Sequence, residues 1–242
     1  MINPEIHVAS KALSAAYATS VNYPNIVLDN FLDPTVLMAV ANEAKVLTQN
    51  YEEESWRFGT PDYHEDQILK LGIRELNKMT PVMELVCAYM NSPEFVQVMR
   101  NLTGIQDLVS DWSLEGGGFH VTYPGGKLGV HHDFNYKDDM APVRMYRKVN
   151  LLIYLNEDWD SSWGGSLELW DQDLTGAFKV IDLIQNRAVI FNSDNAPHGH
   201  PEPLACPVGE SRRSLAFYYY SPTPPDNRLY DRAHWLHDGQ LT

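Results

Sequence analysis

His131 and Asp133 are separated by a single residue, close after the Gly-rich stretch 125–129. Side chains two apart on a strand point to the same side, so this pair can present an imidazole nitrogen and a carboxylate oxygen to one metal ion. His198 supplies a third donor, after the apolar run 188–193 and a turn. Mononuclear non-haem iron sites use two histidines and one carboxylate on one face and leave the opposite positions open. The three residues therefore predict a metal site.

Two positions near this set allow alternatives. His200 offers a second imidazole two residues after His198 and could replace it as the distal ligand. Arg212 and Arg213 stand together before an apolar strand pattern, and the planar, permanently charged fork of either guanidinium is suited to a dicarboxylate. On a strand, Arg212 would share one face with Ser214.

A second His-x-Asp pattern occurs at His64 and Asp66. It lies in a polar stretch before a helical pattern, where an aspartate commonly caps a helix or is solvated. Asp66 is therefore predicted to be a surface or capping residue rather than a metal ligand.

The elements that must position these residues differ along the chain, and residues 1–107 are predicted to form a mainly helical support region. Asp at an N-cap accepts free backbone N–H groups and Pro fits the first helical turn, so these residue types mark helix starts. The first 24 residues show no clear pattern. The expected elements are a strand at 25–31, a helix from Asp33 and Pro34, and helices at 67–79, 81–90 and 93–102, the last capped by Ser92.

From about residue 108, short runs rich in β-branched and aromatic residues alternate with Gly, Asn and Asp. Many short strands at this spacing are typical of a sandwich or barrel, and the helices are expected to cover one face of it. The predicted fold class is α+β in one structural domain, with 108–221 as the β core and 222–242 as an extension on the surface. The expected strands are 119–123, 148–154, 166–170, 178–181, 188–191 and 215–220.

Charge and composition limit the classes of partner. The chain has 242 residues and a formal net charge of −14 at pH 7, which repels the phosphates of nucleic acids and anionic membranes. It carries no long apolar run and no secretory signal pattern. Cys87 and Cys206 lack the spacing of zinc-thiolate motifs and are expected to be free thiols. A cytoplasmic protein without nucleic-acid or membrane partners is predicted.

Together, these motifs resemble the 2-oxoglutarate and iron(II)-dependent oxygenase superfamily, and within it the prolyl 4-hydroxylase-like branch. The resemblance covers roughly residues 118–220, and the order and spacing of the motifs agree throughout. The motifs are Tyr123-Pro124-Gly125-Gly126, His131-x-Asp133, Tyr154-Leu155-Asn156 followed by Gly164-Gly165-Ser166-Leu167, Phe191 through His198 and Gly199, and Arg212-x-Ser214.

The resemblance implies a double-stranded β-helix, or jelly roll, flanked by N-terminal helices. It also implies that His131, Asp133 and His198 bind Fe(II). The family pattern of His-Gly followed by a Pro-containing loop favours His198 over His200.

For the co-substrate, the resemblance implies that Arg212 pairs with the distal carboxylate of 2-oxoglutarate. The family pattern Arg-x-Ser favours Arg212 over Arg213. Ser214 and Tyr154 would assist Arg212, and Tyr123 would line the co-substrate pocket.

The activity implied is hydroxylation of a C–H bond with Fe(II), 2-oxoglutarate and O2, with release of succinate and CO2 and with ascorbate as a candidate reductant. Asp133 favours hydroxylation, because related halogenases lack this carboxylate. The substrate implied is a prolyl residue of a peptide or a free amino acid. The alternative is a non-catalytic, metal-binding jelly-roll module, and either could form a homo-oligomer.

Overall fold

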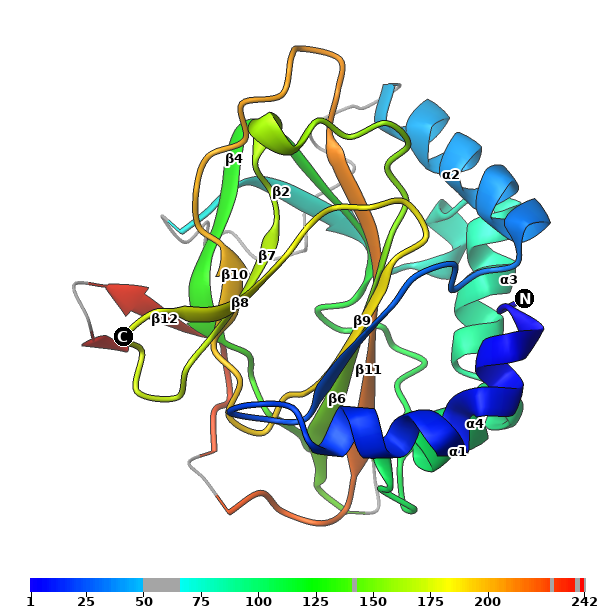
Figure 1. The fold of residues 1–242 in the computed structure, drawn as a ribbon, viewed down its shortest axis with the longest axis vertical. Helices are drawn as coiled ribbons and strands as arrows, with labels where there is room; N and C mark the ends of the chain where they lie inside the picture. The colour runs from blue at the N-terminus through cyan, green and yellow to red at the C-terminus, as the bar shows by residue number, and fades with distance from the viewer. Residues whose placement is uncertain (50–65, 141–142, 227–228, 238–239, 242) are drawn as a thin grey trace.

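Two layers of antiparallel strands face each other, and the helices cover the outer side of one layer (Figure 1). The structure is a computed structural model, which describes residues 1–49, 66–140, 143–226, 229–237 and 240–241. Its helices are α1 Pro4–Ala18, α2 Pro34–Gln49, α3 Pro81–Met90 and α4 Pro93–Thr103, with 3-10 turns at Leu76–Lys78 and Ser161–Trp163. Its strands are β1 Asn25–Leu28, β2 Gln67–Ile73, β3 Val109–Ser110, β4 Gly118–His132, β5 Tyr136–Lys137, β6 Met145–Tyr154, β7 Leu167–Trp170, β8 Ala177–Ile181, β9 Ala188–Asn192, β10 His198–His200, β11 Arg212–Ser221, β12 His234–His237 and β13 Gln240–Leu241.

The long strand β4 connects the two layers. The strand order is β1-β9-β6-β11-β4-β10-β7-β8, and the described neighbours pair antiparallel. The first half of β4 pairs with β11, whereas its second half pairs with β10 in the other layer. This curled antiparallel sheet with flanking helices confirms the predicted α+β fold with a double-stranded β-helix core.

Successive side chains along a strand face alternately the apolar core under the helices and the interior of the β-helix between the two layers. On β6, Val149, Leu151 and Ile153 belong to the main apolar cluster together with residues of α3 and α4. The intervening residues Asn150 and Leu152 line a cavity between the two layers. Because successive side chains of a strand point to opposite faces, the helices stabilise the sheet from outside while the polar residues face inward.

The predicted strands and three of the predicted helices are confirmed. Each expected run from residue 119 onward coincides with a strand, except that Ser166 precedes β7, and the strand expected at 25–31 ends at Leu28. Asp33 accepts a hydrogen bond from the backbone N–H of Thr35 at the start of α2, and Ser92 accepts one from Phe95 at the start of α4. These elements follow from local rules of capping and periodicity.

The helix predicted at 67–79 is wrong, because most of this stretch is strand β2. Ile68 and Leu71 fit a helical spacing, but the buried apolar side chains are those of Leu71 and Ile73, which fit a strand. β2 hydrogen-bonds along β4, so the pairing site on β4 overrides the local helical pattern. Only a 3-10 turn, Leu76–Lys78, remains of the expected helix.

Three further expectations differ from the structure. The first 24 residues, without clear pattern in the sequence, contain helix α1. Asp66 is buried rather than on the surface, and its carboxylate lies 3.5 Å from the ammonium of Lys127. His64, the other residue of this second His-x-Asp pattern, lies outside the described residues. The extension after residue 221 returns to the sheet through β12, which pairs with β4.

Cys87 and Cys206 are both buried free thiols, as predicted. Among the described residues, no helix is both long enough and apolar enough to cross a membrane. The cytoplasmic location and the boundaries at residues 107 and 221 stay predictions.

Candidate active site

The three predicted metal ligands meet at one end of the cavity. His131 is the last residue but one of β4, Asp133 directly follows the end of this strand, and His198 opens β10. His198 lies opposite His131 in the antiparallel pairing of β10 with β4, which brings together two residues far apart in the sequence. One ligand atom from each of the three residues lies within 4.8 Å of those of the other two. This spacing could hold one metal ion.

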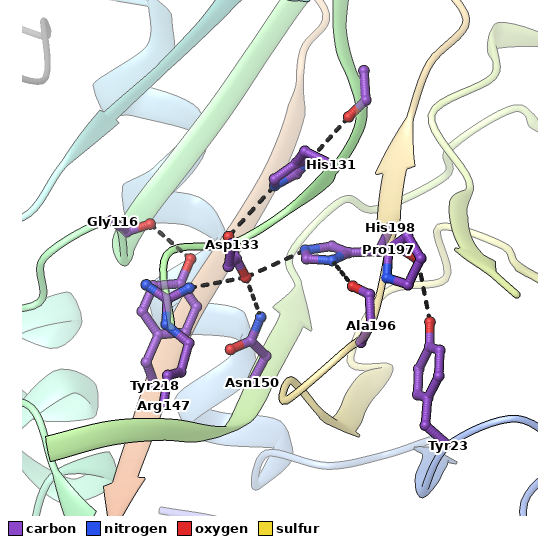
Figure 2. Close-up of polar contacts among 11 residues, drawn as sticks. Tyr23, Gly116, His131, Asp133, Arg147, Asn150, Ala196, Pro197, His198 and Tyr218 are labelled. Carbon is purple, nitrogen blue, oxygen red and sulfur yellow. Dashed lines mark hydrogen bonds and ion pairs between the residues drawn. The ribbon is translucent and has the colours of Figure 1, made fainter. Parts of the chain in front are cut away.

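Backbone carbonyls fix the orientation of both imidazole rings. Nδ1 of His131 lies 2.9 Å from the carbonyl oxygen of Gly129, and Nδ1 of His198 lies 2.8 Å from that of Ala196 (Figure 2). A carbonyl oxygen only accepts, so each Nδ1 carries the proton and donates it. The lone pair of each Nε2 is therefore available for a metal, which is the usual arrangement of histidine ligands.

Two side chains of β6, Arg147 and Asn150, hold the Asp133 carboxylate (Figure 2). Its Oδ2 accepts a hydrogen bond of 2.7 Å from Asn150 and lies 2.9 Å from Nη1 of Arg147. Burial alone raises the pKa of Asp133, but Arg147 and the two histidines hold it well below the usual range of a carboxyl. Asp133 is therefore a carboxylate at neutral pH, with Oδ1 directed toward His131 at 3.4 Å.

Arg147 is fully buried between two aromatic rings. Its guanidinium carbon lies 3.8 Å from the ring centre of Phe134 and 3.8 Å from that of Tyr218. Cation–π contacts on both faces and the pairing with Asp133 compensate the cost of burying the charge. The sequence interpretation missed Arg147 and Asn150, although a polar Asn inside the apolar run 148–154 was a signal that this position faces a site.

Trp235 on β12 adds a wall that the sequence interpretation also missed. It lies opposite His131 in the β12–β4 pairing, and the two ring centres are 4.7 Å apart. Trp235 is buried and lines the cavity. The C-terminal segment therefore belongs to the site, and its aromatic ring restricts the position of the His131 imidazole.

The cavity has a volume of about 400 Å³ and extends from these three residues to Arg212 on β11. Arg212 is buried, and its Nε donates to the carbonyl oxygen of Gly165 at 2.8 Å. In the described part of the chain it forms no ion pair with a carboxylate, and burial lowers the pKa of its guanidinium. A buried cation at the wall of a cavity fits an anionic ligand, since such a ligand would supply the missing counter-charge.

Gly165 explains why the Gly-Gly motif is needed beside Arg212. Its φ is +81°, a conformation that favours glycine. A Cβ there would meet the side chain of Leu204 at 2.9 Å and that of Arg212 at 3.2 Å. A larger residue would displace the arginine from its place on the cavity wall.

The other predicted co-substrate residues are placed differently. Ser214 lines the cavity, and its hydroxyl lies 3.5 Å from Nη1 of Arg212. Tyr154 is fully buried in an apolar cluster with Leu167 and Leu169, and its ring centre lies 5.2 Å from the Arg212 guanidinium. Tyr123 is not among the residues that line the cavity, and its place in the co-substrate pocket stays a prediction. It packs against the main apolar cluster because it faces the side of β4 opposite to His120.

His198 and His200 occupy different positions in the structure, and so do Arg212 and Arg213. Arg213 faces away from the cavity, 3.8 Å from the carboxylate of Glu210. His198 contacts Asp133, with Nε2 3.6 Å from Oδ2, whereas His200 lines the cavity farther from the carboxylate-histidine cluster.

His120 on β4 is expected to make the metal-free protein sensitive to acid. Burial, and then the nearby Lys70, hold the pKa of this imidazole well below 6.5. The unfolded chain therefore binds a proton below about pH 6.5 that the folded chain does not, so the stabilising contribution is complete above pH 6.5 and is lost as the pH falls. We expect His120 to reduce the free energy of unfolding by about 1 kcal/mol between pH 6.5 and 5.5.

Urea unfolding of metal-free protein between pH 5 and 7.5 measures this loss. The variant His120→Gln should show a shallower fall in stability over the same range. Equal slopes for variant and parent would show that His120 is not the group responsible.

A family model described as the 2OG-Fe(II) oxygenase superfamily matches residues 117–220. The matched interval contains His131, Asp133, His198 and Arg212. No curated protein matches the chain.

Several solved structures share the fold. A prolyl 4-hydroxylase from Pseudomonas putida has a TM-score of 0.61 at 19% identity, over 88% of this chain and 99% of that chain. A prolyl hydroxylase from Trichoplax adhaerens, solved with a peptide of hypoxia inducible factor, has a TM-score of 0.63 at 17% identity, over 90% of this chain and 91% of that chain. The α-ketoglutarate-dependent epimerase SnoN of nogalamycin biosynthesis has a TM-score of 0.56 at 15% identity, over 96% and 84%.

At these identities the structural likeness is one of fold. The family match covers the β core on which the three converging ligands and Arg212 lie. Residues 117–220 of this chain therefore match the 2OG-Fe(II) oxygenase superfamily, a family of oxidoreductases of the dioxygenase type, and the chain has the fold of the prolyl 4-hydroxylases.

Proposed function

We propose that the protein is an Fe(II)- and 2-oxoglutarate-dependent hydroxylase that acts on a prolyl residue of a peptide or on a free amino acid. The observation that carries the proposal is one cavity with metal donors at one end and a buried arginine at the other. A dicarboxylate ligand could bind the metal with one carboxylate and pair with Arg212 through the other.

His131, Asp133 and His198 would hold Fe(II). The donor set fits, because two Nε2 atoms and Oδ1 converge while Nδ1 and Oδ2 are engaged elsewhere. When bound, iron with 2-oxoglutarate and O2 supplies the oxidising chemistry for C–H hydroxylation, with release of succinate and CO2. The chain's own residues position the reactants and restrict water at the inner end of the cavity, where the lining residues Lys70, His200 and Arg212 are buried.

Arg212 and Ser214 would bind the distal carboxylate of 2-oxoglutarate. The planar guanidinium pairs with a carboxylate through two parallel hydrogen bonds, and the Ser214 hydroxyl adds a third donor. Tyr154 would act as a positioning residue, since its ring lies against Arg212 and it is not among the residues that line the cavity. One end of the co-substrate is thereby fixed, which orients its other end toward the metal donors.

A prolyl substrate is supported by the fold shared with two prolyl hydroxylases, one of them solved with a peptide. SnoN, an epimerase, has the same fold, so the fold alone does not select the reaction. Ascorbate as reductant, homo-oligomer formation and the absence of nucleic-acid partners stay predictions. The alternative function is a non-catalytic metal-binding module, and an anaerobic titration with 2-oxoglutarate distinguishes it from a hydroxylase.

The test is an anaerobic titration of the Fe(II)-loaded protein with 2-oxoglutarate, which follows the visible charge-transfer band of the chelate. We expect the band in the parent protein and its loss in His131→Ala. Prolyl peptides and free amino acids are then screened for succinate release under air. Iron binding without the band would contradict the proposal and favour the non-catalytic module.

A further inference from the structure

The end of the cavity around Arg212 carries more polar groups than the family motifs account for. In the antiparallel pairings, Thr122 of β4 lies between Lys70 of β2 and Arg212 of β11. Lys70 and Arg212 both line the cavity and both are buried. Burial, and then the charge of Arg212, lower the pKa of Lys70 to about 8, so this ammonium is still mostly protonated at neutral pH. Two buried cations thus face one end of the cavity.

His200 reaches the same end from the opposite layer. It lies on β10 two residues after His198, so both side chains point into the cavity. The intervening Gly199 packs on the backbone of β4, where a Cβ would lie 2.6 Å from the carbonyl oxygen of Gly129. This close contact fixes the direction in which His200 projects.

Both ring nitrogens of His200 lack a hydrogen-bond partner among the described residues. The side chain is 3% exposed, so bulk water does not satisfy them. A buried polar group without a partner costs about 1–3 kcal/mol, and native proteins seldom retain one without a ligand, an ion or an ordered water. Arg212 and Lys70 are the charged groups with the strongest effect on His200, which places it in the field of the two cations.

We propose that His200 is a co-substrate-binding residue that donates a ring N–H to the distal carboxylate of 2-oxoglutarate, beside Arg212. A neutral imidazole adds a donor to this end without adding a third positive charge to Arg212 and Lys70. The inference rests on the proposed function, since it assigns a residue to the co-substrate of that reaction. It makes His200 a determinant of selectivity for 2-oxo acids with a second carboxylate.

The experiment compares two ligands of the Fe(II)-loaded, anaerobic protein. 2-Oxoglutarate has the distal carboxylate, and 2-oxobutyrate has the same 2-oxo acid group without it. In His200→Leu the Kd for 2-oxoglutarate should rise about 10-fold or more, because a hydrogen bond to a charged group is lost. The Kd for 2-oxobutyrate should stay within about twofold of the parent value.

Two further variants control for structure. His200→Gln keeps an N–H donor of similar reach and should retain most of the affinity for 2-oxoglutarate. His132→Leu removes another buried histidine, which stacks on Tyr230 instead of facing the cavity, and should leave both Kd values unchanged. Thermal unfolding of each variant verifies that it is folded.

The outcomes separate this inference from the proposed function. If the parent protein does not bind 2-oxoglutarate, the proposed function fails. If the parent binds it and His200→Leu binds equally well, His200 is satisfied by water and the inference is overturned. An equal weakening of both ligands would also overturn it, since His200 would then act at the metal end.

Discussion

Replacing Asp133 by alanine is expected to abolish Fe(II) binding and to destabilise the metal-free protein by about 3–5 kcal/mol. The first effect follows from the loss of one of three ligands. The second follows because Arg147, fully buried at 2.9 Å from Asp133, would keep its charge without the carboxylate. Removal of one partner of a buried ion pair is more costly than removal of both.

Iron content after dialysis and urea unfolding of the metal-free protein measure the two effects. The double variant Asp133→Ala with Arg147→Met should recover much of the stability, because methionine can fill the space between Phe134 and Tyr218 without a charge. It should still fail to bind iron. Retention of iron by Asp133→Ala would disprove the ligand assignment, and unchanged stability would disprove the energetic coupling to Arg147.

Replacing Arg212 by glutamine is expected to weaken 2-oxoglutarate binding about 100-fold or more while Fe(II) binding is retained. Truncating one partner of a buried, hydrogen-bonded charge pair costs about 2–5 kcal/mol, which corresponds to roughly 30- to 4,000-fold in Kd. Because Arg212 has no carboxylate partner among the described residues, the free protein should not lose stability. Its unfolding free energy should stay equal or rise, the opposite sign to Asp133→Ala.

Arg213→Gln is the matched control, since Arg213 is the next residue, is also buried and faces away from the cavity. Its affinity for 2-oxoglutarate should equal that of the parent. Anaerobic titration of both variants measures the affinities, and urea unfolding measures the stabilities. If Arg213→Gln lost the co-substrate and Arg212→Gln kept it, the two arginines would have to exchange roles.

The local part of the site could be predicted from the sequence. His131 and Asp133 share a side because alternation along a strand depends only on spacing, and Arg212 shares a face with Ser214 for the same reason. Helices α2 and α4 begin where Asp33 and Ser92 can accept backbone hydrogen bonds, which is also a local property. The family resemblance added the choices of His198 and Arg212, which the geometry of the cavity supports.

Only the tertiary structure decided which residues surround these side chains. Arg147 and Asn150 reach Asp133 from β6, which β11 separates from β4, and Trp235 lies next to His131 because β12 pairs with β4. The pairing of β2 with β4 explains why residues 67–73 form a strand instead of the expected helix, and it places Lys70 at the cavity. Tyr123 of β4 faces the core. Periodicity specifies which side chains share a face of one strand, but cross-strand neighbours depend on pairing between segments distant in sequence, which local patterns do not encode.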